Sequence, residues 1–408
     1  MCNRVVIVGG GQAGAQATMS LRQWGYEGEI ILLSEEEHLP YQRPPLSKAY
    51  MKGEMSEERL YLKQSDWYEQ HNVSVQLSTA VEAIDRTDKT VLLDNGKQLS
   101  FDRLILATGS RPRNLSMDDV EGLGNIFTLR GMKDVTLIKP LMKAGQKLVI
   151  LGAGYIGLEA AAVARQLELD VTVLEMAPRI LARVTGPEIS AFYTAEHSRQ
   201  GVDIKTHTAL KTVKGLNGSI SSIILDDDTE LQADLLLVGI GVLPNEELAK
   251  DAGILCDNGI VVDEDACTSD PNVYAIGDCA RRPLVHYSRT GRLESVHNAI
   301  EQGKLAAASI LGRDRPKEEC PWFWSDQYDL KLQIAGLSQG YDETVVRGNL
   351  EERKFAVFYL KNGQLLAVDA VNAAPEFLVA KKLIPLGIKL EPHLLGDVSV
   401  SMKEFLPK

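Results

Sequence analysis

The chain has 408 residues, 44% of them hydrophobic, and its 56 acidic residues outnumber 44 basic ones to give a net charge of −12. This length allows two or three domains of roughly 100–200 residues each, and the negative charge argues against a nucleic-acid partner. No apolar run approaches the ~20 residues that cross a bilayer, and the first residues, "MCNRVVIVGG", enter a strand without a signal-peptide pattern. We therefore expect a cytoplasmic protein that contacts no membrane.

The cysteines predict neither metal nor disulfide chemistry. None of them forms a C-x-x-C pair or another metal-ligand spacing, and the seven histidines are scattered as well. We expect reduced, mostly buried thiols and no metal site. The five positions are Cys2, Cys256, Cys267, Cys279 and Cys320.

Residues 4–36 predict a nucleotide-binding β-α-β unit. The apolar strand "RVVIV" runs into the loop Gly9-x-Gly11-x-x-Gly14, a helix follows, and a second strand ends at Glu35. Glycines at this spacing allow a tight turn and a close backbone approach to a pyrophosphate, which the helix N-terminus attracts. Glu35 is placed to accept hydrogen bonds from ribose hydroxyls.

A stiff stretch, "PYQRPPLSKAY" at residues 40–50, follows this unit. Its three prolines fix the backbone and remove amide donors. We expect it to lead into a short helix that begins near Ser47, with Ser47 as the N-cap.

Residues 147–177 repeat the first pattern. The loop is Gly152-x-Gly154-x-x-Gly157, and Glu175 stands at the ribose position. A carboxylate there repels the 2′-phosphate of NADPH and favours NADH. Arg179 and Arg183 follow soon after. The ordinary role of each is contact with the pyrophosphate or simple exposure to solvent. The helices of the two units are expected to bury, at helical spacing, Ala17, Leu21 and Trp24 in the first and Ile156, Ala160 and Leu167 in the second.

The remaining strands end in turns or form hairpins. Asn95-Gly96 and Asn362-Gly363 each lie between alternating apolar runs and predict hairpins over 90–101 and 355–371, and residues 222–234 predict a third. Buried strands are expected to end at Thr108-Gly109, at the Gly-x-Gly turn that contains Gly241, and at Gly277-Asp278. The last ~90 residues carry no glycine-rich loop and predict a separate α+β module.

Two Rossmann-type loops imply two dinucleotides, of which one accepts and the other donates a hydride. FAD and NADH are the simplest such pair. The fold class predicted is therefore α/β, with two Rossmann-like dinucleotide-binding domains and a C-terminal α+β domain.

Several longer stretches now resemble one family, the two-dinucleotide flavoprotein reductases with the glutathione-reductase fold. Within it, the chain is most similar to the ferredoxin reductases that serve bacterial cytochrome P450s and ring-hydroxylating dioxygenases. The resemblance runs nearly end to end and rests on "RPPLSKAY", "GYIGLE", "VTGPEISAFY", "TSDPNVYAIGDCAR", "PWFWSDQYDLKLQIAGLSQGYD" and "LLGDVSV". It implies a discontinuous FAD-binding domain at residues 1–113 and 245–318, an NADH-binding domain at 114–244 and a C-terminal domain at 319–408.

The resemblance also implies roles for single residues. Asp278 would hydrogen-bond the ribityl chain, Ala13 the pyrophosphate, and Val81 would receive the adenine edge. Arg130 and Val296 would lie by the flavin, although core packing and solvation are the ordinary roles of such valines and arginines. The other expected cofactor contacts are Arg43, Thr108, Gly109, Gly277 and Trp324 for FAD, and Tyr155, Ile156, Arg183 and Gly241 for NADH.

Lys48 and Glu159 are expected to form a buried ion pair beside the flavin, as the corresponding residues do in the resembling reductases. A buried charge is costly alone and tolerable when paired. Lys48 would stabilise negative charge on the reduced flavin, and Glu159 would hold the lysine away when nicotinamide enters. Trp322 and Trp324, on one face of an extended stretch, are either core aromatics or a wall through which electrons leave.

The predicted activity is that of an NADH-dependent, FAD-containing ferredoxin reductase. A hydride passes from NADH to flavin N5, and single electrons then pass to a small acidic [2Fe–2S] ferredoxin that supplies a P450 or oxygenase. We expect a monomer, and a basic docking patch near Lys304, Lys331, Lys381 and Lys382.

Three alternative functions occur among proteins of this fold. A disulfide reductase, or a cysteine-dependent NADH oxidase or peroxidase, needs a cysteine near residues 38–48, and none lies between Cys2 and Cys256. A redox-sensitive binding protein similar to apoptosis-inducing factor is disfavoured, because the chain shows no targeting segment or long basic insertion. A rubredoxin reductase differs only in its electron acceptor and stays open.

Overall fold

The computed structural model describes residues 3–117 and 120–407. The chain divides into two compact units. Unit 1 consists of Met1–Gln42, Glu57–Arg111 and Val242–Glu319, and unit 2 of Arg43–Ser56, Pro112–Gly241 and Cys320–Lys408. Among the described residues, no helix combines the length and the apolar character that a membrane crossing requires.

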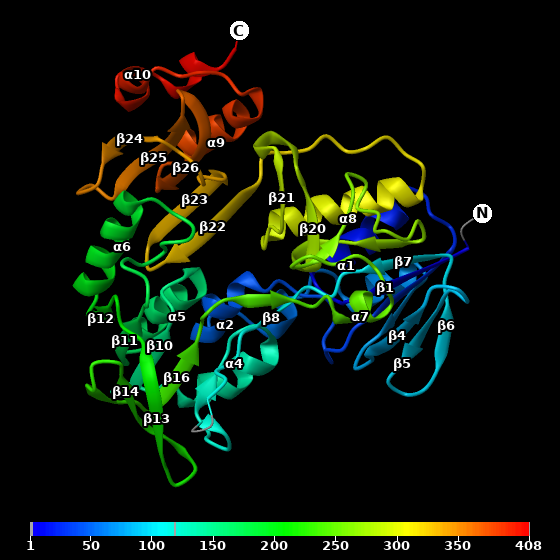
Figure 1. Ribbon diagram of the computed structural model, residues 1–408, viewed down its shortest axis with the longest axis horizontal. Helices are drawn as coiled ribbons and strands as arrows, with labels where there is room; N and C mark the ends of the chain where they lie inside the picture. The colour runs from blue at the N-terminus through cyan, green and yellow to red at the C-terminus, as the bar shows by residue number, and fades with distance from the viewer. Residues whose placement is uncertain (1–2, 118–119, 408) are drawn as a thin grey trace. The chain divides into compact units, whose positions relative to one another are not determined.

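Unit 1 is built on a parallel sheet with the strand order β19-β7-β1-β2-β3 (Figure 1). Side chains of β1 alternate between two cores, with Val5 and Ile7 on one face and Val6 and Val8 on the other. Burial on both faces explains why this strand is a continuous apolar run. The strands are β1 (Arg4–Val8), β2 (Glu29–Leu33), β3 (Val73–Gln76), β7 (Arg103–Leu106) and β19 (Val273–Ala275).

Two helices, α1 (Gln12–Gln23) and α8 (Val296–Ile310), lie side by side on one face of this sheet (Figure 1). They approach closely because α8 carries Gly303, where an added Cβ would lie 3.0 Å from the backbone nitrogen of Ala17. Ala17 and Leu21 are fully buried, as the helical spacing predicts.

The smaller elements of unit 1 are two short sheets, one strand pair and two helices. The predicted hairpin over residues 90–101 is confirmed, since β5 pairs with β6 in antiparallel register. The elements are β4 (Val81–Asp85), β5 (Thr90–Leu93), β6 (Gln98–Ser100), β8 (Ser110–Pro112), β17 (Val242–Pro244), β18 (Ile260–Val261), β20 (Ala280–Leu284), β21 (Arg289–Gly291), α3 (Ser65–Gln70) and α7 (Glu247–Asp251).

Unit 2 contains a second parallel sheet, with the order β12-β11-β10-β16-β9, and an antiparallel sheet that confirms the hairpin predicted at 222–234. The strands are β9 (Ile126–Phe127), β10 (Lys147–Leu151), β11 (Asp170–Leu174), β12 (Val202–Lys205), β13 (Leu210–Leu216), β14 (Ser219–Leu225), β15 (Glu230–Gln232) and β16 (Leu235–Val238). The helices are α2 (Ala49–Lys52), α4 (Met132–Ile138), α5 (Tyr155–Gln166) and α6 (Pro187–Arg199).

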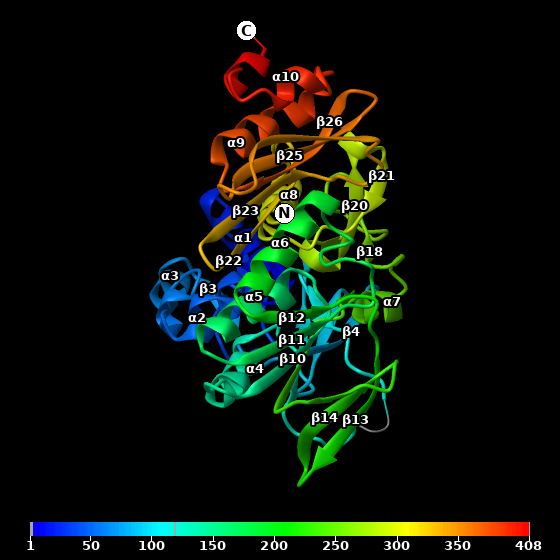
Figure 2. The ribbon, with the colours of Figure 1, turned by 90° about the vertical axis from the view of Figure 1, so that its left-hand side faces the viewer.

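The C-terminal part of unit 2 is an antiparallel sheet with the order β22-β23-β26-β25-β24, and α9 packs on it (Figure 2). Phe377 and Leu383 on α9 enter the same core as Phe358 on β25. The hairpin predicted at Asn362-Gly363 joins β25 to β26. The elements are β22 (Trp322–Gln327), β23 (Leu330–Gly336), β24 (Glu343–Asn349), β25 (Lys354–Lys361), β26 (Gln364–Val371), α9 (Ala374–Leu383) and α10 (Pro392–Gly396).

The predicted fold class is confirmed by these two parallel sheets and the C-terminal sheet. The division into three domains stays a prediction, because the compact units number two. Arg43–Ser56, which the family resemblance assigns to the FAD-binding domain, groups with unit 2.

Candidate functional sites in the two units

The first glycine loop is shaped by backbone crowding on one side and open space on the other. Gly9 has φ +119°, and an added Cβ would lie 2.1 Å from the carbonyl oxygen of Ala107. A Cβ on Gly14 would lie 2.1 Å from the oxygen of Gly9, whereas one on Gly11 would meet no atom within 4 Å. Gly11 is the N-cap of α1, whose first N–H groups lack partners within the helix. Open space next to free donors fits a pyrophosphate.

The second loop repeats this geometry in unit 2. Gly152 has φ +94° and an added Cβ would lie 2.4 Å from the oxygen of Gly239, while a Cβ on Gly157 would lie 2.3 Å from the oxygen of Gly152. Gly154, the N-cap of α5, faces open space in the same way as Gly11. Each unit therefore contains a loop that fits one dinucleotide.

The two ribose-position acids differ in how firmly they are held. Glu35 is exposed beyond the end of β2, and its carboxylate accepts no hydrogen bond from the part of the chain that the structure describes. The Glu175 carboxylate accepts two backbone N–H bonds, both at 2.8 Å, from Ala153 in the glycine loop and from Ala177. Each Glu175 oxygen can accept one further bond, so a fixed carboxylate faces the ribose position in unit 2.

Asp278 lies beside the first glycine loop. Its neighbour Gly277 has φ +78°, and an added Cβ there would lie 2.9 Å from the Cβ of Ala13. Ser110 Oγ donates to Asp278 Oδ2 at 3.0 Å. The structure thus brings Ala13, Gly277 and Asp278 together at the ends of β19 and α1.

Thr108 and Gly109 form a reciprocal connection with Asn245. Thr108 Oγ1 donates to the Asn245 carbonyl at 2.6 Å, the Asn245 side chain donates to the Thr108 carbonyl at 2.8 Å, and the Asn245 amide donates to Gly109 at 3.0 Å. Val81, at the start of β4, packs against a core of unit 1, and Val296 is the partly buried first residue of α8. Their contacts with a cofactor stay predictions.

In unit 2, the structure joins two arginines predicted to contact FAD, Arg43 near its phosphates and Arg130 on its flavin side. Arg43 Nη1 donates to the carbonyl oxygen of Arg130 at 2.8 Å. The Arg130 amide in turn donates to Asp134 at 2.6 Å at the start of α4. Nothing in the sequence pattern had linked these two positions.

The predicted ion pair between Lys48 and Glu159 is present. Lys48 Nζ lies 2.6 Å from Glu159 Oε2, and the side chains are 18% and 4% exposed. Glu159 is therefore not a solvent-facing residue of α5. Lys48 Nζ also donates to the Pro44 carbonyl at 3.2 Å, which holds the lysine against its own turn.

Ser47 is not the helix cap that the sequence predicted. Pro44–Ser47 form a 3₁₀ turn, and Lys48 is the N-cap of α2. The Lys48 side chain makes no cap hydrogen bond. Ser47 Oγ instead donates to Glu159 Oε2 at 2.5 Å. The cap falls on Lys48, one residue later than predicted, because Ser47 is the last residue of the 3₁₀ turn.

The predicted NADH contacts show one further departure from expectation. Ile156 is 43% exposed rather than part of the buried helix face, because it lies on the first turn of α5, beside the open space at Gly154. Tyr155 packs against Phe323 with ring centroids 4.7 Å apart, and burial raises the pKa of its hydroxyl well above the usual range. An added Cβ on Gly241 would lie 3.7 Å from Nη1 of Arg183, so these two residues are neighbours.

Arg179 makes structural contacts. Its guanidinium donates to Ser190 Oγ at 2.6 Å and to the Ala182 carbonyl at 3.1 Å. Arg183, by contrast, is exposed.

Trp322 and Trp324 lie on one face of β22, as predicted, with ring centroids 5.5 Å apart. Trp322 also packs against Phe377 at 5.9 Å, and the Lys381 ammonium lies 5.4 Å from the Trp322 ring centroid. Trp322 therefore packs in part as a core aromatic, while the role of Trp324 at the flavin stays a prediction.

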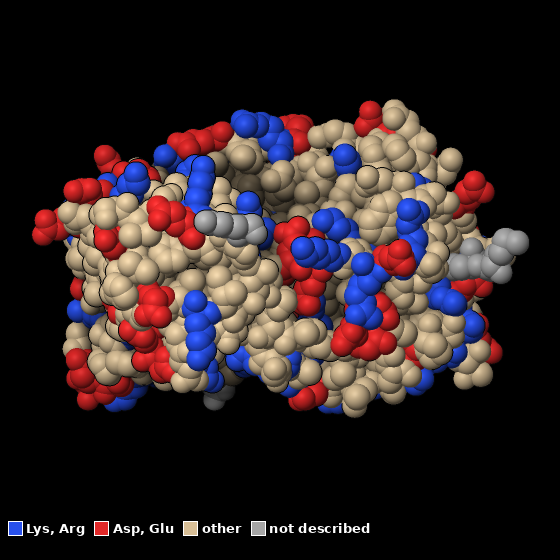
Figure 3. All heavy atoms as spheres, turned by 90° about the horizontal axis from the view of Figure 1, so that it is seen from above, with Lys and Arg blue, Asp and Glu red and all other residues tan. Residues whose placement is uncertain are grey.

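The predicted docking lysines differ in their surroundings. Lys331 and Lys382 are exposed, whereas Lys304 pairs with Glu301 at 3.1 Å. On the face shown in Figure 3, acidic and basic side chains are interspersed rather than segregated. The docking patch stays a prediction.

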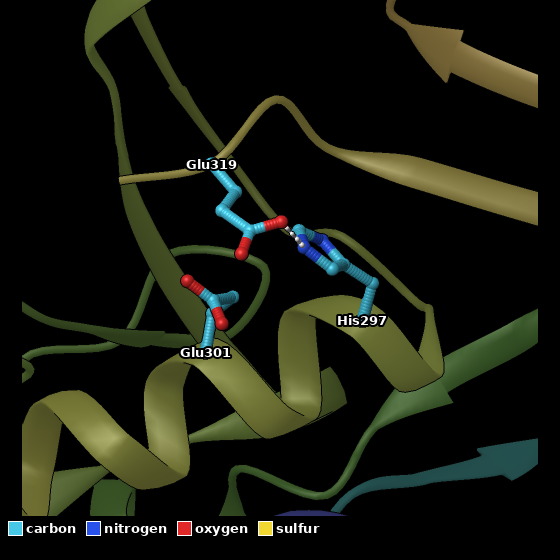
Figure 4. Close-up of side chains that lie close together, drawn as sticks. All are labelled: His297, Glu301 and Glu319. Carbon is cyan, nitrogen blue, oxygen red and sulfur yellow. Dashed lines mark ion pairs between the residues drawn. The ribbon is translucent and has the colours of Figure 1, made fainter. Parts of the chain in front are cut away.

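Three side chains of metal-ligating types converge in unit 1 (Figure 4). His297 and Glu301 share one side of α8, Glu319 approaches from the following segment, and one possible ligand atom from each lies within 4.8 Å of the others. Lys304 already pairs with Glu301, and Glu319 Oε2 lies 3.4 Å from His297 Nε2. We assign no metal to this group, because Glu301 already pairs with Lys304 and exposed acidic groups commonly lie together without an ion.

The cysteines of the described chain form no disulfide bond. Cys279 and Cys320 are buried, and Cys256 and Cys267 are partly buried. Burial raises the pKa of the Cys256 thiol to about 11, so this thiol is unreactive at neutral pH. Cys2 lies outside the described residues.

Comparisons with known proteins agree with this geometry. Residues 3–303 match the pyridine nucleotide-disulphide oxidoreductase family, and residues 322–406 match the reductase C-terminal family. Putidaredoxin reductase of Pseudomonas putida is 45% identical over 99% of this chain and 97% of its own length. A rubredoxin-NAD(+) reductase of the same species is 40% identical over 90% of this chain and 95% of its own length.

Among solved structures, the reductase in a covalent putidaredoxin reductase–putidaredoxin complex superposes with a TM-score of 0.96. It is 44% identical, and the match covers 98% of this chain and 97% of that one. The resemblance predicted from the sequence is thereby confirmed. The chain belongs to the pyridine nucleotide-disulphide oxidoreductase family, with a reductase C-terminal domain, in the group that includes putidaredoxin reductase.

Proposed function

We propose that this protein is an NADH-dependent, FAD-containing ferredoxin reductase. The observation that carries the proposal is the buried ion pair between Lys48 and Glu159, in a chain that has two dinucleotide loops but no cysteine between Cys2 and Cys256. A disulfide reductase of this fold needs a thiol at the flavin, whereas a reductase that passes electrons onward needs only charge control there.

The residues of unit 1 fit FAD. The first glycine loop would hold the pyrophosphate through the amides at the start of α1, and Glu35 offers a free carboxylate to the ribose. Asp278 stands next to Ala13 at the loop, where its carboxylate would accept bonds from ribityl hydroxyls. The second loop and Glu175 would hold NADH in the same way. When bound, NADH supplies a hydride and FAD converts it into single electrons.

Lys48 supplies a positive charge whose position is fixed by Glu159. An ammonium in a partly buried site stabilises negative charge more than it would in water, because the local dielectric constant is lower. Glu159 keeps that charge in place because its own carboxylate is held by the hydroxyls of Ser47 and Ser325.

The preference for NADH follows from Glu175. Its carboxylate is held by two backbone amides and would lie against the 2′-phosphate of NADPH. Arg179 offers no compensation, because its guanidinium is engaged with Ser190 and Ala182.

The electron acceptor is a small [2Fe–2S] ferredoxin that supplies a P450 or an oxygenase, and the reductase works as a cytoplasmic monomer. The relative solved in complex with putidaredoxin supports a ferredoxin. The rubredoxin-NAD(+) reductase among the relatives keeps rubredoxin as the second candidate acceptor.

The test is rapid-mixing reduction of the bound flavin with NADH and with NADPH, followed by a panel of ferredoxins and rubredoxins. We expect faster reduction with NADH and efficient electron transfer to at least one ferredoxin. A flavin that NADH bleaches but that reduces no ferredoxin would instead favour a redox-sensitive binding protein. Preferential reduction of rubredoxin would move the proposal to the second acceptor.

A further inference from the structure

The Glu159 carboxylate on α5 is surrounded by side-chain donors from two other segments of unit 2, residues 43–56 and β22. Ser47 Oγ and Lys48 Nζ approach Oε2 at 2.5 and 2.6 Å, and Ser325 Oγ on β22 donates to Oε1 at 2.6 Å. Glu159 is 4% exposed, Ser47 5% and Ser325 0%. Both carboxylate oxygens are therefore satisfied inside the protein rather than by solvent.

A buried chain of hydrogen bonds continues from Ser325. Gln327 Nε2 donates to Ser325 Oγ at 3.1 Å, and Gln327 Oε1 lies 2.8 Å from His197 Nε2 on α6. His197 Nδ1 in turn lies 3.0 Å from the hydroxyl of Tyr328. Gln327 is 1% exposed and His197 0%. Ser325 and Gln327 point to the same side of β22 because side chains alternate along a strand.

The donor and acceptor roles in this chain follow from counting hydrogens. An ion-paired carboxylate has no hydrogen to offer, so the Ser325 hydroxyl must donate to Glu159. Ser325 then accepts from the Gln327 amide, which leaves Gln327 Oε1 to accept from His197 Nε2–H. With the opposite amide orientation, Gln327 Oε1 would face Ser325 Oγ and the Ser325 hydrogen would turn towards it. Ser325 Oγ and Glu159 Oε1 would then lie 2.6 Å apart with no hydrogen between them.

The far end of the chain is neutral. Burial lowers the pKa of His197, so the imidazole carries one proton, on Nε2, and its Nδ1 accepts from Tyr328. Burial raises the pKa of Tyr328, so its hydroxyl keeps the hydrogen. Every dipole in the chain therefore points its positive end toward Glu159, and aligned bonds of this kind strengthen one another.

We propose that Ser325 and Gln327, on the C-terminal sheet, are positioning residues for the Lys48–Glu159 pair. Through them, His197 and Tyr328 hold the Glu159 carboxylate in place so that Lys48 keeps one position. The kinetic consequence rests on the function proposed above, whereas the hydrogen bonds do not. The C-terminal domain is thus part of the reductive site and does more than offer aromatic side chains.

The first test measures the limiting rate of flavin reduction at saturating NADH in the FAD-loaded protein. Ser325→Ala removes one bond to a charged group and should lower that rate about tenfold, with FAD content and the Kd for NADH unchanged. Ser325→Thr keeps the hydroxyl and should restore the rate. Gln327→Met, of similar volume, should lower it by a smaller factor. Ser338→Ala, in the loop after β23, is the matched control and should match the wild type.

A wild-type rate in Ser325→Ala, or a loss fully explained by loss of FAD, would overturn the proposal. The bleaching of the bound flavin is measured without ferredoxin. If NADH bleaches the flavin but the reduced protein passes no electrons to any ferredoxin, the proposed function fails while this test remains valid.

The second test needs no activity. Nitrogen-15 NMR of the histidine rings should show His197 as the neutral Nε2–H tautomer from about pH 6 to about pH 8, with its resonances assigned from a His197→Phe variant. In Gln327→Met, the His197 Nε2 signal should shift, because its acceptor is gone. An Nδ1–H tautomer, or protonation of His197 within this range, would contradict the direction of the chain.

Discussion

Lys48 Nζ lies 2.6 Å from Glu159 Oε2, with Glu159 almost fully buried and Lys48 partly exposed. The pair joins the proline-rich stretch to the first turns of α5, and the part of the stretch from Arg43 onward belongs to unit 2. The exposed part of Lys48 leaves its charge able to act on a bound group, while the buried Glu159 fixes where that charge lies.

The first prediction concerns this charge. Lys48→Met should slow flavin reduction by NADH by about 10- to 100-fold, because an ammonium no longer stabilises negative charge at the site. FAD should stay bound. The control is Lys52→Met, which removes a lysine of α2 that pairs with Glu54 at 2.6 Å near the surface and should leave the rate unchanged. Equal rates in the wild type and Lys48→Met would make Lys48 a purely structural residue.

The second prediction separates the two ribose-position acids. Glu175→Ala should raise the ratio of kcat/KM for NADPH to that for NADH by about tenfold, because the repulsion of the 2′-phosphate is removed. The value for NADH should also fall, because the Ala153 and Ala177 amides lose their acceptor. Glu35→Ala, in the other unit, should weaken FAD binding and leave the coenzyme ratio unchanged. A change in ratio caused by Glu35→Ala alone would reverse the assignment of the two loops.

The third prediction separates folding from binding within one loop. Gly9→Ala should destabilise the protein by about 1–3 kcal/mol or more, because φ is +119° and the new Cβ would meet a carbonyl oxygen. Gly11→Ala should leave thermal unfolding of the FAD-free protein unchanged, since its Cβ meets no protein atom within 4 Å. It should nevertheless reduce FAD affinity. Full FAD affinity in Gly11→Ala would show that the open space is not the pyrophosphate site.

Local sequence patterns predicted the parts of the fold that local physics decides. The alternation of Val5 to Val8 between two cores, the hairpin turns and the glycine loops all depend on residues close in the chain. The ion pair between Lys48 and Glu159 came from the family resemblance, because no spacing rule links two segments so far apart.

The departures have tertiary causes. Ser47 carries a good N-cap side chain, but it ends the preceding 3₁₀ turn and donates its hydroxyl hydrogen to the buried Glu159 carboxylate on α5. Ile156 has the right spacing for a helix face but lies where the glycine loop leaves open space. Ser325 and Gln327 were missed, although the β22 sequence WFWSDQ places them in alternate positions after its aromatic residues. Polar side chains on a buried strand face need hydrogen-bond partners.

The fourth prediction concerns Asp369 on β26, which is 1% exposed and accepts a hydrogen bond from Tyr359 at 2.6 Å. Burial raises the pKa of Asp369 to about 7 from an ordinary 3.8. The folded protein therefore binds this proton more tightly than the unfolded chain does. The stabilisation is fully present below about pH 4 and is lost as the pH rises to about 7, by at most about 1.4 kcal/mol per pH unit.

Asp369→Asn cannot ionise, so its thermal stability should not share this decline. The unfolding temperature of the wild-type FAD-loaded protein should fall relative to that of the variant between about pH 5 and pH 7. Above about pH 7, the difference between the two unfolding temperatures should stay constant. The control is Asp329→Asn, because the exposed Asp329 pairs with Arg353, which lowers its pKa. Any loss of stability tied to Asp329 in the wild type should be small and should appear as the pH falls. A difference between wild type and Asp369→Asn that is constant with pH would mean that Asp369 ionises in the fold as it does in water.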